Sequence, residues 1–219
     1  MNKHNNHIVI PILGARATDF YQGELERQSQ ISESADLPLL LLETDFERIN
    51  ANLPDKYKAL TPLVGCLLRH MEETGAPVYL IPNITLHAAV ARIELDEQTL
   101  HRIINPIDCG ITHLKAQEIE EITLVGTRHT MQSDQLAGFF ESRGITVKFP
   151  ETDDISALDA LRLQVFEEGF SKGAKKDMDK ILSRYDNPVL ACTELSILNR
   201  ESQFIDLARL QIAAALKRL

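Results

Sequence analysis

The chain has 219 residues, a formal net charge of −9 at pH 7, and a composition that is 44% hydrophobic and 25% charged. This length and composition suit one large domain or two small ones, each able to bury a core. The acidic balance argues against nucleic acid as a partner, since that requires a basic surface. No apolar run approaches the roughly 20 residues that span a bilayer, so we expect no membrane contact.

The three cysteines favour a reducing compartment. Cys66, Cys109 and Cys192 are far apart and form no CxxC pair, which argues against a disulfide framework and against a zinc site. The first seven residues lack the cationic and then apolar order of a signal peptide. We therefore expect a cytoplasmic protein without a bound metal.

The first half of the chain alternates strands with helices. Continuous apolar runs predict buried strands, and these runs cover residues 8–13, 37–42 and 78–81. Helical spacing or helix-start signals predict helices between and after these strands. One begins near Thr18 and another covers 54–74. After the third strand, one helix ends at about residue 93 and another covers 95–103. Asn105-Pro106 then breaks the pattern, and we place a domain crossing near it.

The second half repeats this alternation. Its predicted strands cover 122–125, 145–149 and 189–191. Its predicted helices cover 111–119, 131–142, 175–185 and 204–219. Thr130 is the predicted cap of the helix over 131–142, and a further helix is predicted to begin at Asp154 or Ser156. Strands that alternate with helices throughout predict an α/β protein with parallel sheets.

The two halves also end alike. Each has three strand–helix steps, and the third strand runs into a polar motif: Asn83-Ile84-Thr85 in the first half and Cys192-Thr193-Glu194 in the second. A pseudo-twofold pairing of two βαβ units would set these motifs opposite one another across a cleft.

The motif around Cys192 has the composition of a reactive site. In open α/β sheets, ligands bind at the carboxyl ends of strands, where the next helix presents free N–H groups. A thiol there can have a lowered pKa, because a helix N-terminus favours the thiolate, and Glu194 can orient it or exchange protons with it. The alternative is that Cys192 is a buried core cysteine and Glu194 an acid at a helix start.

The whole chain resembles the aspartate/glutamate racemase superfamily, whose members use no cofactor. The resemblance is carried by ordered pieces: Leu13-Gly14, Ala17-Thr18-Asp19-Phe20-Tyr21, Glu43-Thr44-Asp45-Phe46, Pro82 with Thr85-Leu86-His87, Gly126-Thr127-Arg128-His129-Thr130-Met131, Val165-Phe166-Glu167-Glu168, Ala191-Cys192-Thr193-Glu194-Leu195, and Ile205-Asp206. It implies two pseudo-symmetric three-layer α/β lobes with parallel sheets and an interlobe cleft, usually in a homodimer. The first lobe would comprise residues 1–104 plus 204–219, and the second 105–203.

The resemblance also implies a mechanism and its residues. Two thiols flank the α-carbon of the substrate, one as base and the other as acid. By this resemblance Cys192 is the acid/base of the second face and Glu194 is its partner. The hydroxyls of Thr85, Thr127, Thr130 and Thr193 would bind the substrate carboxylate and stabilise the charge that develops on it.

The chain departs from that pattern on the first face. Asn83 occupies the position of the first thiol, and an amide cannot exchange a proton near neutral pH. The opening loop is shortened and carries Arg16, which either clamps a second carboxylate or lies on the surface.

Three functions remain open for a small acidic amino acid or dicarboxylate as the ligand. The first is a racemase-like isomerase that works through Cys192. The second is a single-cysteine decarboxylase or isomerase of a dicarboxylic acid. The third is a catalytically degenerate binding protein that keeps the cleft without the chemistry.

Overall fold

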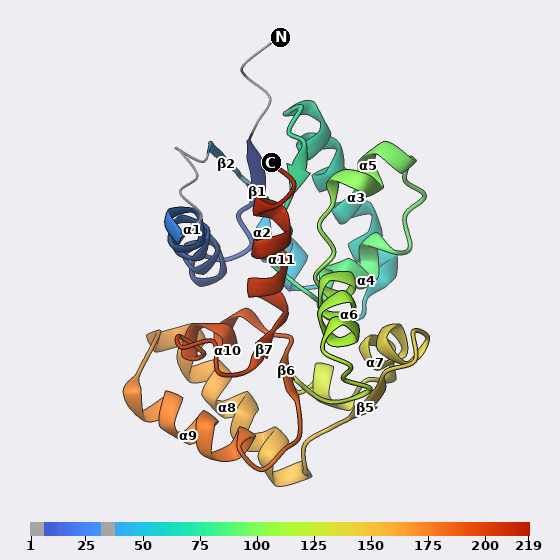
Figure 1. Ribbon diagram of the computed structural model, residues 1–219. Coiled ribbons are helices and arrows are strands. Elements are labelled where there is room, and N and C mark those ends of the chain that lie inside the picture. Colours follow the sequence, from blue (N-terminus) through green and yellow to red (C-terminus); the bar gives the residue numbers. More distant parts are fainter. Residues whose placement is uncertain (1–6, 32–37) are drawn as a thin grey trace. The chain divides into compact units, whose positions relative to one another are not determined.

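The computed structural model describes residues 7–31 and 38–219, which form two compact units (Figure 1). The first unit contains the described residues up to Asn105 together with Gln211–Leu219, and the second contains Pro106–Leu210. Each unit is built on its own parallel sheet. The predicted α/β fold with parallel sheets is therefore confirmed. Leu37, the predicted start of the strand at 37–42, lies outside the described residues.

The first unit has a three-stranded parallel sheet in the order β2-β1-β3. The strands are β1 (Ile8–Pro11), β2 (Leu39–Leu42) and β3 (Val78–Tyr79). Every residue of β1 is buried, as expected for a central strand that is apolar on both faces. β3 is shorter than the predicted strand at 78–81. Leu80 still donates its N–H to the Val9 carbonyl over 3.0 Å, but Pro82 has no N–H with which to continue the ladder.

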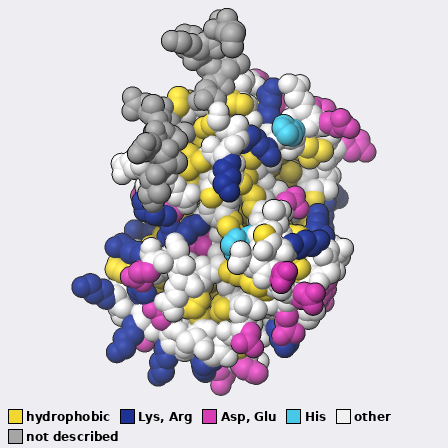
Figure 2. Space-filling view, in the orientation of Figure 1, with side chains coloured by type: hydrophobic (Ala, Val, Ile, Leu, Met, Phe, Trp, Pro, Cys, Tyr) yellow, Lys and Arg dark blue, Asp and Glu magenta, His cyan; other side chains and the backbone are white. Residues whose placement is uncertain are grey.

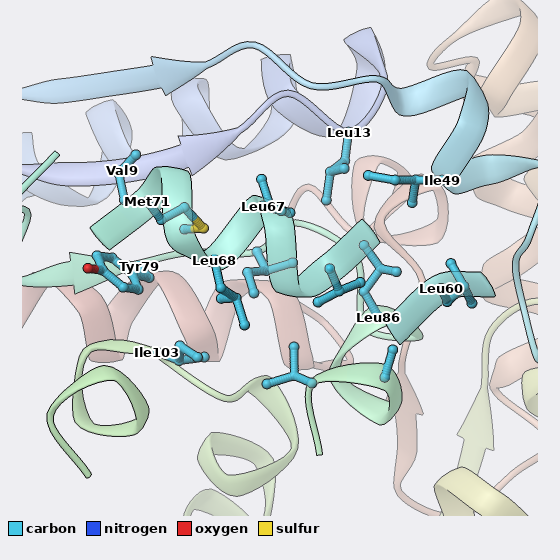
Figure 3. Packing of buried hydrophobic residues seen from close by; sticks show 14 of the residues in the cluster. Val9, Leu13, Ile49, Leu60, Leu67, Leu68, Met71, Tyr79, Leu86 and Ile103 are labelled. Atoms are coloured by element: carbon cyan, nitrogen blue, oxygen red, sulfur yellow. The ribbon is translucent and has the colours of Figure 1, made fainter. Parts of the chain in front are cut away.

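Helices surround this sheet, and one of them supplies much of the core. The helices are α1 (Ala15–Ile31), α2 (Phe46–Asn50), α3 (Tyr57–Glu73), α4 (Leu86–Val90) and α5 (Glu97–Arg102). The apolar positions of α3 recur at helical spacing, and Figure 3 shows Leu67, Leu68 and Met71 among Val9 and Tyr79 in one buried cluster. Burying each large apolar side chain contributes about 1.5–3 kcal/mol, so this stripe holds α3 on the sheet.

The end of the chain is joined to the first unit by a buried amide. Gln211 is fully buried in α11 (Leu207–Leu216). Tyr21 donates its hydroxyl to Gln211 Oε1 over 2.5 Å, and Gln211 Nε2 donates to the Ile104 carbonyl over 2.7 Å. Because a buried amide without partners is costly, these two bonds hold α11 in register with the rest of the unit.

The second unit has a four-stranded parallel sheet in the order β5-β4-β6-β7. Its strands are β4 (Glu121–Val125), β5 (Thr146–Lys148), β6 (Pro188–Leu190) and β7 (Ile205–Asp206). The prediction of a continuous helix over 204–219 was wrong, because β7 comes first and pairs with β6. Asp206 Oδ1 then accepts the N–H groups of Ala208 and Arg209, which starts α11 at Leu207. Two strand residues are too few to show a period in the sequence.

The helices of the second unit begin and end where local capping dictates. They are α6 (Pro106–Ala116), the 3₁₀ turn η1 (Thr130–Gln132), α7 (Asp134–Glu141), α8 (Thr152–Glu168), α9 (Lys172–Leu182) and α10 (Thr193–Leu198). The predicted helix over 131–142 is interrupted at Ser133, whose hydroxyl accepts the Gln135 N–H and caps α7. Thr130 therefore does not cap α7. Similarly, Ser171 accepts the Ala174 N–H over 3.0 Å and starts α9 before the predicted Lys175.

In the second unit α8 packs against α9 and α10 (Figure 1). One apolar cluster joins these helices to the sheet and includes Leu158 and Val165 of α8 with Cys192 and Leu195.

Positively and negatively charged side chains both occur on the face shown in Figure 2. Among the helices of the described residues, none combines the length and apolar character needed to cross a membrane.

Candidate active site

Cys192 lies at the carboxyl end of β6, as the sequence predicts. β6 runs parallel to β4, and the Ala191 N–H extends the ladder by donating to the Val125 carbonyl over 2.7 Å. Cys192 follows in an extended conformation at the N-cap position of α10. The buried apolar run thus ends where the chain turns into a helix, which places the thiol at the edge of the sheet.

The thiol of Cys192 is paired with a carboxylate. Cys192 is only 6% exposed, and its Sγ donates to Glu194 Oε2 over 2.9 Å. The side chain makes no capping hydrogen bond to α10, so its hydrogen-bonding capacity is directed to Glu194. Sulfur and carboxylate can therefore share a proton directly.

The electrostatics at Cys192 favour the neutral thiol. Burial raises the pKa of the Cys192 thiol well above its usual value, and the charge and hydrogen bond of Glu194 raise it further. The Glu194 backbone N–H and the Arg162 guanidinium lower this pKa, but they are the smaller effects. The expected lowering of the thiol pKa by the helix start is therefore wrong. Desolvation opposes the thiolate more strongly than a six-residue helix supports it.

A pair of threonine hydroxyls follows the neighbouring strand β4. Thr127 Oγ1 and Thr130 Oγ1 are 3.0 Å apart, and the Thr130 N–H donates to Thr127 Oγ1 over 3.1 Å. Gly126 makes this loop possible, because a Cβ there would lie 2.9 Å from the Thr130 methyl carbon and 3.2 Å from the Ala191 carbonyl oxygen. Only glycine lets the ends of β4 and β6 approach so closely. The loop with both hydroxyls thus lies beside the segment that leads into Cys192.

Two residues of α8 belong to this end of the sheet, and sequence reasoning missed them. Asp159 Oδ1 accepts from Arg162 Nε over 2.9 Å and from the Arg128 N–H over 3.1 Å. Asp159 therefore joins α8 to the loop that carries Thr127 and Thr130. The one signal in the sequence is the i, i+3 spacing of Asp159 and Arg162, which is common on helix surfaces.

Asn83 follows β3 in the first unit and caps a helical turn. Its side-chain Oδ1 accepts the Leu86 N–H over 3.1 Å, and its backbone carbonyl accepts from the same N–H over 3.2 Å. The amide thus satisfies a donor at the start of α4. Thr85 is the residue before α4, and its hydroxyl makes no capping bond there.

In the first unit, His87 lies in the helix that follows β3, and Arg16 lies in the helix that follows β1. His87 is buried, and its Nε2 is 3.4 Å from the Ile81 carbonyl oxygen. Burial lowers the pKa of His87 to about 4, so the ring is neutral at pH 7. Arg16 lies in the first turn of α1, directly after β1 and Gly14. Gly14 has a φ of +91°, which favours glycine.

The predicted site residues fall into two groups. The second unit brings together Cys192, Glu194, Thr193, Thr127 and Thr130. Thr193 is buried as the first residue of α10. The first unit holds Arg16, Asn83 and Thr85 beside the carboxyl ends of β1 and β3.

A known protein family matches almost the whole length of this chain. The sequence profile described as Asp/Glu/Hydantoin racemase matches residues 10–215. The chain belongs to the Asp/Glu/hydantoin racemase family. The resemblance inferred from the sequence motifs is thus confirmed. Comparison with curated protein sequences gives no match.

Several solved structures share the fold of this chain. An aspartate racemase homologue from Pyrococcus horikoshii has a TM-score of 0.80 at 18% identity, covering 97% of this chain and 98% of that chain. Picrophilus torridus aspartate racemase has a TM-score of 0.72 at 19% identity, with coverages of 97% and 93%. The maleate isomerase of Pseudomonas putida has a TM-score of 0.60 at 11% identity, with coverages of 96% and 90%. At these identities the comparisons establish the fold.

The other cysteines of this racemase-family chain lie within helices. Cys66 is a half-buried residue of α3, and Cys109 is a half-buried residue of α6. Neither follows a strand, so neither has the surroundings of Cys192. Within residues 7–31 and 38–219, no group of three or more His, Cys, Asp or Glu side chains is arranged to hold a metal ion.

Proposed function

We propose that this chain is a racemase-like isomerase that exchanges the α-proton of a small acidic amino acid through Cys192, without a cofactor. The observation that carries the proposal is the 2.9 Å contact between Cys192 Sγ and Glu194 Oε2 at the end of β6. Membership of the racemase family supports the reaction class.

The Cys192–Glu194 pair can serve both directions of proton transfer. In the resting state the thiol carries the proton and can give it to a carbanionic α-carbon, which leaves sulfur as thiolate. In the opposite direction Glu194 first takes the thiol proton, and the thiolate then removes the α-proton. The α-proton is a weak acid, so the charge that moves onto the substrate carboxylate must be stabilised. The hydroxyls of Thr127, Thr130 and Thr193 are proposed to donate to it.

The residues of the first unit have binding roles in this proposal. Asn83 replaces a thiol, cannot exchange protons, and its Oδ1 already accepts the Leu86 N–H. Thr85 would donate to the substrate carboxylate, and Arg16 would clamp a second carboxylate bidentately. The wide spacing of the three cysteines favours a reducing compartment such as the cytoplasm, and membership of the family favours a homodimer. Sedimentation analysis of the purified chain tests the dimer.

One observation favours a second candidate, a single-cysteine decarboxylase or isomerase of a dicarboxylic acid. Burial and Glu194 keep Cys192 protonated, and a protonated thiol is ready to donate to an enediolate. Cys66 and Cys109 lie in helices rather than after strands, so neither replaces the thiol missing at Asn83. A reaction that generates the enediolate by losing CO₂ needs only this one proton donor.

The deciding experiment is proton NMR of the α-position in deuterated water, with aspartate and glutamate of both hands. Exchange of one enantiomer without conversion supports a working Cys192 and an inactive Asn83, whereas exchange with inversion requires another acid for the second proton. Turnover of a malonate- or maleate-like acid that Cys192→Ala abolishes would favour the second candidate. No exchange and no turnover, with thermal stabilisation by a carboxylate that survives Cys192→Ala, would replace both with a binding function.

A further inference from the structure

Arg162 lies at the edge of the apolar face of α8, between apolar residues on one side and Asp159 on the other. Leu158 is four residues before Arg162 and Val165 is three residues after it, so both lie on the same side of the helix as Arg162. Leu161, one residue before Arg162, extends this apolar face. Leu158 and Val165 are buried in the cluster that contains Cys192, and Leu161 packs against that cluster. The Arg162 side chain is only 19% exposed. A guanidinium on a core-facing stripe needs a reason, because its desolvation is unfavourable.

Asp159 holds this guanidinium in place. Its side chain is 14% exposed, and its Oδ1 accepts from Arg162 Nε over 2.9 Å. The same carboxylate accepts the Arg128 N–H and lies 3.7 Å from Arg128 Nε. Two guanidinium groups thus share one carboxylate, so this group of three side chains carries one positive charge in excess.

We propose that Arg162 is a positioning residue for Cys192: held by Asp159 on the core-facing side of α8, it stabilises the negative charge left on sulfur when the thiol releases its proton. In the donating step the S–H bond breaks, the proton goes to the α-carbon, and the electron pair stays on sulfur. Glu194, 2.9 Å away, opposes this charge, and the excess positive charge of the α8 group counteracts Glu194. The use of this step in turnover depends on the proposed function, but the charge on sulfur does not.

Other charged or titratable groups lie on the elements that pack around Cys192, and Lys175 and Asp206 among them have partners of their own. On α9, Lys175 binds Asp179 and Glu201. At the end of β7, the buried Asp206 accepts from Ser196 Oγ of α10. His129 is half-buried in the loop after β4. On α8 itself, the guanidinium of Arg162 lowers the pKa of the thiol.

The test is alkylation of Cys192 by iodoacetamide across pH 6–11, without substrate, with the Cys192 peptide followed by mass spectrometry. Arg162→Met removes the charge and keeps much of the volume. It should move the midpoint up by about half a pKa unit, a roughly threefold loss of thiolate at lower pH. Arg162→Lys should keep the midpoint close to that of the unchanged chain. Asp159→Asn, which increases the excess positive charge, should move it down.

The matched control is Arg143→Met, which removes an exposed guanidinium that pairs with Asp108 in the same unit. An unchanged midpoint in Arg162→Met, or an equal shift in Arg143→Met, would overturn the inference. If Arg162→Met fails to fold by circular dichroism, Arg162→Gln decides: an upward shift supports the inference, and no shift or a downward shift overturns it. Alkylation requires no turnover, so the alkylation result can be interpreted even if no α-proton exchange is detected. Conversely, the exchange result can be interpreted whatever the alkylation experiment shows.

Discussion

The ends of β3 and β6 show how the two units use equivalent places differently. Asn83, after β3, places its side-chain oxygen on the Leu86 N–H and completes a turn of backbone. Cys192, after β6, caps nothing, and its sulfur is paired with Glu194. One side chain satisfies the main chain, and the other retains a proton that it can transfer. A polar residue at a strand end is thus a catalytic candidate only when its hydrogen bonds are not needed locally.

The largest expected effect separates these two ends directly. Cys192→Ala should lower the rate of α-proton exchange by roughly 10²–10⁴-fold, because it removes the proposed acid/base. Asn83→Ala should leave exchange on the Cys192 face within about tenfold. NMR in deuterated water measures both, and Cys109→Ala in α6 is the matched control for loss of a thiol. Equal losses in the Cys192 and Asn83 variants would remove the distinction between the two ends.

The second prediction concerns acid stability of the first unit. His87 has its pKa lowered to about 4 by burial, from an ordinary 6.5. Between these values the unfolded chain binds more protons than the folded chain, so stability is present above pH 6.5 and falls as pH drops toward 4. The loss should reach about 3 kcal/mol at pH 4.

Urea unfolding at pH 7 and pH 4 measures this loss. In His87→Gln the His87 part of the pH dependence should disappear, whereas His70→Gln, at an exposed position of α3, should retain it. An unchanged pH dependence in His87→Gln would mean that the buried imidazole is not the source.

The third prediction sharpens the electrostatics of the second unit. Glu194 raises the pKa of the Cys192 thiol through its charge and hydrogen bond, so Glu194→Gln should lower that pKa. Alkylation of Cys192 at pH 8 should then become faster, by up to about tenfold, while α-proton exchange slows because the proton acceptor is lost. Glu168→Gln, at the exposed end of α8, should change neither rate. Slower alkylation in Glu194→Gln would show that the carboxylate assists the thiolate instead.

The smallest expected effect is structural and belongs to Asn83. Asn83→Ala should reduce the free energy of unfolding by about 1 kcal/mol, because the Leu86 N–H loses its side-chain acceptor. Asn83→Asp keeps an oxygen at that position and should lose much less. Denaturant titration compares the two variants. A full loss in Asn83→Asp would exclude the capping explanation.

Much of the fold was predictable because its signals are local. The runs that became β1 and β6 are continuous and apolar, and β4 is mostly apolar apart from Glu121 and Thr123, which is typical of central parallel strands. The thiol at the end of β6 could be located for the same reason. Boundaries were less predictable: Ser133 interrupts a segment with helical spacing by capping the next helix, and β7 is too short to leave a pattern.

Local sequence patterns were enough to predict the family, the parallel α/β units, and the positions of Cys192 and Glu194 directly after a buried strand. The direction of the pKa shift at the thiol depends on the folded chain instead, because burial, which raises this pKa, comes from packing by distant segments. The same packing places Asp159 and Arg162, some 30 residues earlier in the chain, on the helix that lies against α10. Local sequence patterns encode hydrogen-bonding and helix-forming preferences. The electrostatic potential at a sulfur atom, by contrast, is the sum of contributions from all the charged and polar groups that the fold places around it.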